Sequence, residues 1–217
     1  MTAPVTVVLP LYDEPHSRIE RALVSAIAAR PAEIIVVDDG SPSPVEVAGE
    51  GVRLIRTEHR GLASALNTGI DAATQPYVQW LSAGDSIHPN KLTLQSERMA
   101  SEQWRASISV VQVDSFVLPR FSWRRRLWTT MSIGMIGALV ETSLLREIRY
   151  DESLTWAVDW RMALEIHARG LWQYIPLVLG VCTANDGHSD RGGDSPIRAE
   201  NFARVEAWAR EMKCTSA

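Results

Sequence analysis

The sequence predicts an α/β fold with a mainly parallel, twisted sheet and helices on both faces. Short runs rich in β-branched residues alternate with stretches of helical periodicity through the first half of the chain. The run at residues 6–9 is apolar enough to be a buried strand. Apolar residues make up 46% and charged residues 22%, as in soluble globular proteins. These observations exclude a disordered or fibrous chain.

The length of 217 residues favours one domain over the whole chain, 1–217, with a regular half up to about residue 95 and a less regular half from about 105. The net charge of −4 argues against a protein that binds nucleic acid over its whole surface. Cys182 and Cys214 lack the spacing of a disulfide or zinc framework. With no apolar run of about 20 residues and no signal-peptide pattern, we expect a cytoplasmic protein, with peripheral attachment to a membrane as an alternative.

Each element expected in the first half follows from a local sequence pattern. A helix at 18–29 has apolar residues at helical spacing and stops at Pro31, and another opens after Gly61. Pro89 stands where a third helix begins. The expected order is strand 6–9, helix 18–29, strand 33–38, strand 52–55, helix 62–73, strand 77–81 and helix 89–104.

The second half is less regular. Gly170 is placed to end a helix at 158–168. The remaining expected elements are strands at 107–113, 136–140 and 174–182, a basic aromatic loop at 119–128, a polar stretch at 185–194 and a final helix at 197–212.

Polar residues that follow the strands are the candidates for chemistry, because ligands of parallel sheets bind at the carboxyl ends of the strands. Tyr12 and Glu14 follow the first strand, and Asp38 and Asp39 end the second. An aromatic ring can stack on a nucleobase, and a carboxylate can accept from an imide N–H or ribose hydroxyls. The alternative is that Asp-Gly-Ser simply forms a turn.

Three further residues have two interpretations each. Asp85 could bind a divalent cation that bridges a diphosphate, or cap the helix near Pro89. Asp159 begins a helix between Trp156 and Trp160, so it is either a base made more basic by burial or a favourable charge at a helix start. His188 lies in a Gly/Asp loop, where a lone histidine is usually neither ligand nor base.

Four motifs then occur in a familiar order. VTVVLPLYDE at residues 5–14 resembles the VSVIIPTYNE opening of family 2 glycosyltransferases, and EIIVVDDGS at 33–41 matches their second motif. GLASALNTGI at 61–70 is similar to their GLAAALNRGI helix, and residues 77–85 stand where the family has YIAFLDADD. The resemblance is strong over about residues 5–95 and thinner beyond.

The resemblance implies a GT-A fold that binds a nucleotide-diphosphate sugar, most simply a UDP-sugar, and transfers one sugar with inversion. Residues up to about 95 would bind the donor and residues 105–217, with the C-terminal helix, the acceptor. Asp159 would be the catalytic base. The other expected contacts are Pro10, Tyr12, Glu14, Asp38, Asp39 and Asn67 to the donor, and Trp156, Trp160 and Arg124 to the acceptor.

The chain departs from the family at its D-x-D motif, where it has Ser82-Ala83-Gly84. Asp85 and His188 would then have to hold the expected Mn²⁺ or Mg²⁺. Val158 also replaces the glutamate of the family's Glu-Asp pair. The altered motif keeps open a catalytically impaired protein that only binds sugar nucleotides.

Other enzyme classes and acceptors can be weighed as well. No dinucleotide-binding, P-loop, zincin or α/β-hydrolase motif occurs. A nucleotidyltransferase would need a Gly-rich basic loop after the first strand, which the acidic Leu-Tyr-Asp-Glu does not supply. The acceptor could be a glycan, a lipid-linked sugar or a nucleic acid. Residues 120–128, with four arginines and three aromatics, could grip nucleic acid or an anionic membrane, or form an ordinary solvated loop.

Overall fold

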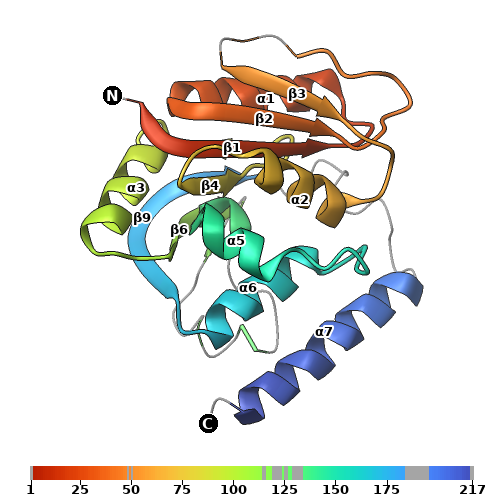
Figure 1. The fold of residues 1–217 in the computed structure, drawn as a ribbon, viewed down its shortest axis with the longest axis vertical. Coiled ribbons are helices and arrows are strands. Elements are labelled where there is room, and N and C mark those ends of the chain that lie inside the picture. Colours follow the sequence, from red (N-terminus) through yellow and green to blue (C-terminus); the bar gives the residue numbers. More distant parts are fainter. Residues whose placement is uncertain are drawn as a thin grey trace.

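A computed structural model describes residues 2–47, 49, 51–113, 116–118, 124, 127–128, 134–183 and 196–215. Within these residues, nine strands form one sheet in the order β3-β2-β1-β4-β8-β6-β9-β5, with β7 paired to β6 (Figure 1). The expected α/β class is confirmed, because the sheet is mainly parallel and carries helices on both faces.

The first half builds the regular parallel part of the sheet. β1 pairs in parallel with both β2 and β4, and β2 pairs in parallel with β3. The elements are β1 (Ala3–Leu11), α1 (His16–Ala28), β2 (Pro31–Asp38), β3 (Val52–Arg56), α2 (Leu62–Ala72) and β4 (Tyr77–Trp80). All four strands therefore end at one edge of the sheet, which we call the carboxyl edge, and begin at the opposite, amino edge.

The second half adds a mixed extension. β8 is antiparallel to β4 and β6, whereas β6 and β9 are parallel to each other. The elements are β5 (Ser86–Ile87), α3 (Lys91–Ser101), β6 (Ala106–Val113), β7 (Phe116–Leu118), η1 (Met135–Gly137), β8 (Ala138–Glu141), α5 (Thr142–Ile148), α6 (Val158–Ala168), β9 (Trp172–Cys182) and α7 (Pro196–Thr215). The sequence analysis did not predict β5, β7 or α5.

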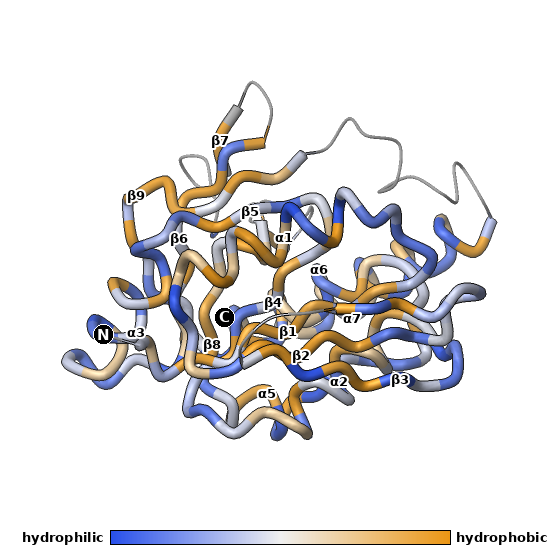
Figure 2. Tube along the Cα trace, turned by 90° about the horizontal axis from the view of Figure 1, so that it is seen from above, coloured by the Kyte–Doolittle hydropathy of each residue, from blue (hydrophilic) through white to orange (hydrophobic). Residues whose placement is uncertain are grey.

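Successive residues of the central strands are buried on opposite faces, which explains why these strands are apolar throughout. Val7 belongs to one core with α1 and α3, and Val8 to a second core with α2, α5 and α6. Figure 2 shows the hydrophobic colour following β1, β2 and β4 through the middle of the molecule. The sheet therefore has a hydrophobic core on each face.

The core between α3 and the sheet contains a buried lysine. The Nζ of Lys91 donates to Gln79 Oε1 at 2.5 Å, to the side-chain oxygen of Gln95, and to the carbonyl of Ala138 at 3.3 Å. Burial lowers the pKa of Lys91 well below its ordinary value. These contacts connect α3 to β4 and β8.

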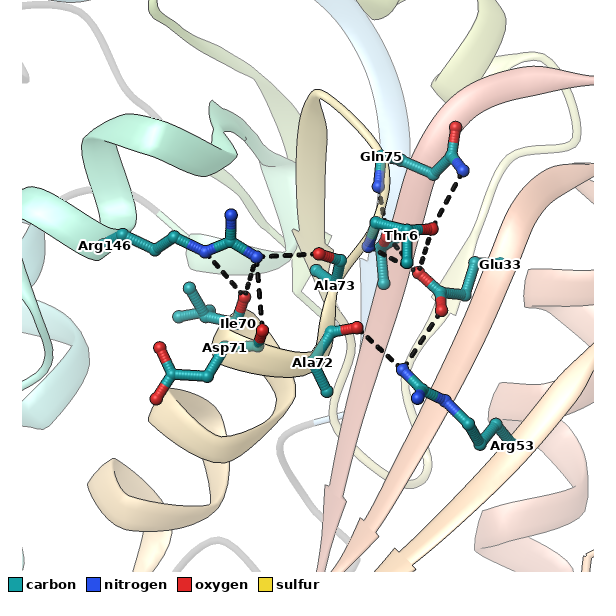
Figure 3. A network of polar contacts seen from close by, with 10 residues as sticks. Thr6, Glu33, Arg53, Ile70, Asp71, Ala72, Ala73, Gln75 and Arg146 are labelled. Atoms are coloured by element: carbon teal, nitrogen blue, oxygen red, sulfur yellow. Dashed lines mark hydrogen bonds and ion pairs between the residues drawn. The ribbon is translucent and has the colours of Figure 1, made fainter.

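Polar contacts also close the amino edge (Figure 3). Arg146 donates to the last carbonyls of α2, at 3.1 Å to Ile70 and 2.7 Å to Ala73. Glu33 accepts from Thr6 Oγ1 at 2.8 Å and from Arg53 Nη2 at 3.2 Å. A cation at a helix C-terminus is stabilising, so this edge is occupied by contacts that hold the fold.

Candidate functional site

The loops after β1 and β2 are tied together at the carboxyl edge. The backbone N–H of Asp39 donates to the Leu11 carbonyl at 2.8 Å, and the N–H of Asp13 donates to Ser41 Oγ at 3.0 Å. The structure thus brings Pro10 and Tyr12 beside the Asp38–Asp39 turn, as the sequence predicts.

Asp38 is a buried residue that holds this turn. Its Oδ1 accepts from the Ser41 N–H at 2.9 Å and its Oδ2 accepts from Arg56 Nη1 at 2.6 Å. Asp38 is 0% exposed. These contacts are the turn-forming role that Asp-Gly-Ser allows, and the expected contact of Asp38 with a nucleotide stays a prediction.

Asp39 joins the same turn to the start of α2. Its carboxylate accepts from the backbone N–H groups of Arg60 and Gly61, at 2.9 and 2.8 Å. Gly40 makes this approach possible, because a Cβ at this position would lie 2.7 Å from the backbone nitrogen of His59. The φ of Gly40 is +73°, which glycine adopts without strain. The carboxylate is therefore fixed in position at the carboxyl edge.

Tyr12 and His59 form a stacked pair beside Asp39. Their ring centroids are 3.8 Å apart with an interplanar angle of 21°. The Nδ1 of His59 lies 2.9 Å from Asp39 Oδ2 and 3.1 Å from its carbonyl oxygen. Since both neighbours are acceptors, Nδ1 carries the hydrogen. Sequence analysis missed His59, although it follows the third strand just as Tyr12 follows the first.

Asn67 of α2 contacts the chain at Tyr150 and Glu152. Its side-chain amide donates to the Tyr150 carbonyl at 3.0 Å and to Glu152 Oε1 at 2.9 Å, and its oxygen accepts from the Tyr150 N–H at 3.0 Å. Asn67 is 3% exposed. In this structure Asn67 joins residues 150–152 to α2, and the Arg60–Glu152 ion pair at 2.8 Å reinforces this, so the donor contact of Asn67 stays a prediction.

Asp159 is the second residue of α6, close to Tyr150. Its Oδ1 accepts from the Trp160 N–H at 2.8 Å. Burial raises the pKa of Asp159 above its ordinary value of 3.8, and these backbone contacts offset part of that effect. Burial and, to a smaller extent, the nearby Asp159 carboxylate raise the pKa of Tyr150. Such a group is a better proton acceptor than a solvated aspartate.

The two tryptophans beside Asp159 differ. Trp160 is 1% exposed, and its indole N–H donates to the Leu127 carbonyl at 2.8 Å. The expectation that Trp160 lines an acceptor pocket is therefore corrected, since it belongs to the core. Trp156 is partly buried, and the Arg198 guanidinium of α7 lies 5.2 Å from its ring centroid.

Arg124 and His188 are the remaining predicted site residues, expected to bind the acceptor and a metal ion respectively. Arg124 Nη2 donates to the Trp172 carbonyl at 2.6 Å, where β9 begins. Because β9 is parallel to β6 and its first residue pairs with Ala106, this contact lies at the amino edge, and the expected acceptor role of Arg124 stays a prediction. His188 falls outside the described residues.

The loop after β4 holds the altered D-x-D motif. Asp85 is 9% exposed and its Oδ1 accepts from the Thr183 N–H at 3.2 Å. Glu14 pairs with Arg18 at 3.1 Å, and Arg18 Nη2 donates to the Ala83 carbonyl at 2.8 Å. Across the described part of the chain, no group of three or more His, Cys, Asp or Glu side chains is placed to hold a metal ion. Asp85 is the one expected metal ligand that the structure describes, so the Mn²⁺ or Mg²⁺ site that it would share with His188 stays a prediction.

Two curated relatives match about two fifths of the chain. An uncharacterized glycosyltransferase of Rickettsia prowazekii, RP339, is 36% identical over 94 residues, which are 41% of this chain and 29% of that protein. The succinoglycan biosynthesis protein ExoW of Rhizobium meliloti is 34% identical over 102 residues, 42% of this chain and 32% of ExoW. The match thus covers less than a third of each relative.

Solved structures and a family model extend the match. The crystal structure of S. aureus TarS 1-349 in complex with UDP-GlcNAc has a TM-score of 0.75 and 17% identity, covering 98% of this chain and 66% of that one. The crystal structure described as S. aureus TarS 1-349 gives a TM-score of 0.73. The fold is therefore the expected GT-A type. The sequence model of Glycosyl transferase family 2 matches residues 6–157, well over half of the chain. The chain belongs to glycosyl transferase family 2.

Proposed function

We propose that this protein transfers a sugar from a nucleotide-diphosphate sugar to an acceptor hydroxyl. The observation that carries the proposal is the group formed by Tyr12, His59 and Asp39 at the carboxyl edge. The imidazole stacks on the Tyr12 ring and presents an N–H to the Asp39 carboxylate. A flat base with an N–H on its edge, such as uracil, makes the same two interactions.

Uracil is the base that we propose, so the donor is a UDP-sugar. The support is chemical, since a fixed carboxylate selects an imide N–H, and it agrees with the UDP-GlcNAc named for the TarS complex. Pro10, at the end of β1, lies next to the same position. His59 must then leave the Tyr12 ring, or shift along it, when the base binds.

The transfer is a single displacement with inversion. Asp159 takes the proton of the acceptor hydroxyl, and that oxygen forms a bond to the anomeric carbon. The bond from this carbon to the diphosphate oxygen breaks, and its electron pair leaves with UDP. Burial supports the role of Asp159 because it raises the pKa of the carboxyl.

The acceptor side of the proposal depends on the second half. Trp156, partly buried just before α6 and three residues from Asp159, is the residue that we propose contacts the acceptor. The structure describes no helix that is both long and apolar enough to cross a membrane. Within the described chain, Asp85 is the carboxylate nearest in sequence to the altered D-x-D motif, and by itself it makes a poor metal site.

The second candidate is a sugar-nucleotide-binding protein without transferase activity, which Gly84 in the D-x-D motif favours. A panel of nucleotide sugars, each incubated with glycan, lipid-linked and nucleic-acid acceptors, separates the two by the nucleotide released. We expect acceptor-dependent release of UDP by the wild type and little by Asp159→Asn. Binding of UDP-sugars without release from any pair would establish the second candidate.

A further inference from the structure

Two arginines of α1 converge on the loop after β4. Arg18 Nη2 donates to the Ala83 carbonyl at 2.8 Å, and Arg21 Nη1 donates to the Gly84 carbonyl at 3.4 Å. The Gly84 N–H donates in turn to the Arg18 carbonyl at 3.0 Å. The start of α1 and the residues of the altered D-x-D motif are thus held together at the carboxyl edge.

The Arg18 guanidinium occupies the space that a side chain at position 84 would need. A Cβ built on Gly84 would lie 2.8 Å from Arg18 Cζ and 2.9 Å from its Nη2. The φ of Gly84 is +88°, which is strained for residues with a side chain. An aspartate at position 84, as in the D-x-D motif of the family, would clash with the Arg18 side chain in its present rotamer. Glycine at this position therefore makes room for the positive charge of Arg18.

Arg18 is also held in a fixed orientation. Its Nε donates to Glu14 Oε2 at 3.1 Å, and the Arg18 side chain is 15% exposed. Glu14, expected to touch the donor, contacts this guanidinium instead. With its Nε on Glu14 and one Nη2 N–H on the Ala83 carbonyl, the guanidinium would meet phosphate oxygens through its remaining N–H groups, and it keeps its charge at any physiological pH.

We infer that Arg18 binds the diphosphate of the donor and stabilises the departing UDP, so that a guanidinium does the work usually given to a divalent cation. The inference rests on the proposed function. As the bond from the anomeric carbon to the diphosphate breaks, negative charge grows on the leaving oxygen, and a fixed cation lowers the energy of that charge. Glu14 is a positioning residue for Arg18, and Arg21 adds a second positive charge beside the loop.

Calorimetric titration with UDP and with uridine, in EDTA and in Mn²⁺, tests this. The wild type should bind UDP with the same Kd in both conditions. Arg18→Gln should weaken UDP binding about tenfold to hundredfold, as expected for lost hydrogen bonds to a charged group, and leave uridine binding unchanged. Arg18→Lys should recover part of the loss. Arg146→Gln is the matched control, because Arg146 also donates to carbonyls but lies at the amino edge.

The outcomes separate this inference from the proposed function. UDP binding that needs Mn²⁺, or that is unchanged in a folded Arg18→Gln variant, overturns the role of Arg18 and leaves the proposed function standing. No binding of UDP or uridine by the wild type in either condition overturns both. If Arg18→Gln is unfolded by circular dichroism, the Arg18→Lys variant decides, with unchanged UDP binding in EDTA counting against the inference.

Discussion

The two edges of the sheet use the same residue types in different ways. At the amino edge, Arg146 and Glu33 contact the end of α2 and the strands beside it. At the carboxyl edge, Asp39 and Arg18 are equally well fixed, and Asp39 lies beside the Tyr12–His59 pair, whose tyrosine is 39% exposed. The number of hydrogen bonds alone therefore does not identify a ligand-binding site. Both edges are rich in contacts, but only the carboxyl edge combines fixed charges with an accessible aromatic ring.

The same comparison applies to neighbouring residues. Asp38 and Asp39 are adjacent and both buried, but Asp38 contacts a turn N–H and an arginine, whereas Asp39 meets two backbone N–H groups and the His59 ring. We therefore expect Asp39 to affect ligand binding and Asp38 to affect stability. The predictions below run from the largest expected effect to the smallest.

Asp159→Asn should lower kcat by at least about a hundredfold, because a positioned base is typically worth about 10²–10⁴ in rate. The variant keeps the size of the side chain and should bind UDP as the wild type does. Steady-state rates and calorimetry measure the two effects. Glu165→Gln, also on α6, is the control. A fully active Asp159→Asn enzyme would assign the base to another carboxylate.

The pH dependence of stability gives Asp159 a second test. Its pKa is raised in the folded state, so folded protein binds more protons than unfolded protein between 3.8 and the raised value. The free energy of unfolding falls as pH rises through this window. At neutral pH Asp159→Asn should therefore melt at a higher temperature than the wild type, measured by circular dichroism. A lower melting temperature would mean that the carboxylate stabilises the fold.

Asp39→Asn should weaken UDP binding by about tenfold, the effect of losing one hydrogen bond to a charged group. Asp38→Asn should instead lower the free energy of unfolding by about 1.5 kcal/mol, since Arg56 is partly exposed and its charge is screened. Calorimetry and urea unfolding of both variants distinguish the roles. Equal loss of UDP affinity in the two variants would remove the distinction.

His59→Ala should strengthen UDP binding about threefold to tenfold, because an aromatic contact of about 0.5–1.5 kcal/mol no longer has to be broken. Titration with UDP and with uridine should show the same gain, since the effect concerns the base. Weaker binding of both would mean that His59 stays and contacts the base itself.

Arg146→Ala should have the smallest effect. Removing a cation from the C-terminus of α2 costs about 1 kcal/mol of unfolding free energy, and UDP affinity should stay unchanged. Urea unfolding and calorimetry check both parts. Loss of UDP affinity in a folded variant would show that the two edges are coupled.

The sequence predicted the fold class and the first four strands because buried parallel strands and helical periodicity are local patterns. β5 has two residues and exists through its pairing with β9, far along the chain, so no local pattern marks it. α5 follows β8 directly, with no glycine or proline between them. These elements depend on contacts that a local pattern does not contain.

The candidate site was predicted in part for the same reason. Tyr12 and Asp39 follow strands that share an edge, so their proximity could be inferred. Asn67 contacts Tyr150 and Trp160 contacts Leu127, and neither partner is visible in local sequence. The proposed role of Arg18 could not be predicted from the sequence, because it depends on the guanidinium lying where a Cβ of residue 84 would be.

A crystal structure with UDP tests the central claim, that the carboxyl edge binds the donor nucleotide, most directly. The account predicts the uracil ring stacked on Tyr12, its imide N–H on the Asp39 carboxylate, and His59 moved from the position that it holds without ligand. UDP bound elsewhere, with the Tyr12–His59 stack intact, would contradict it.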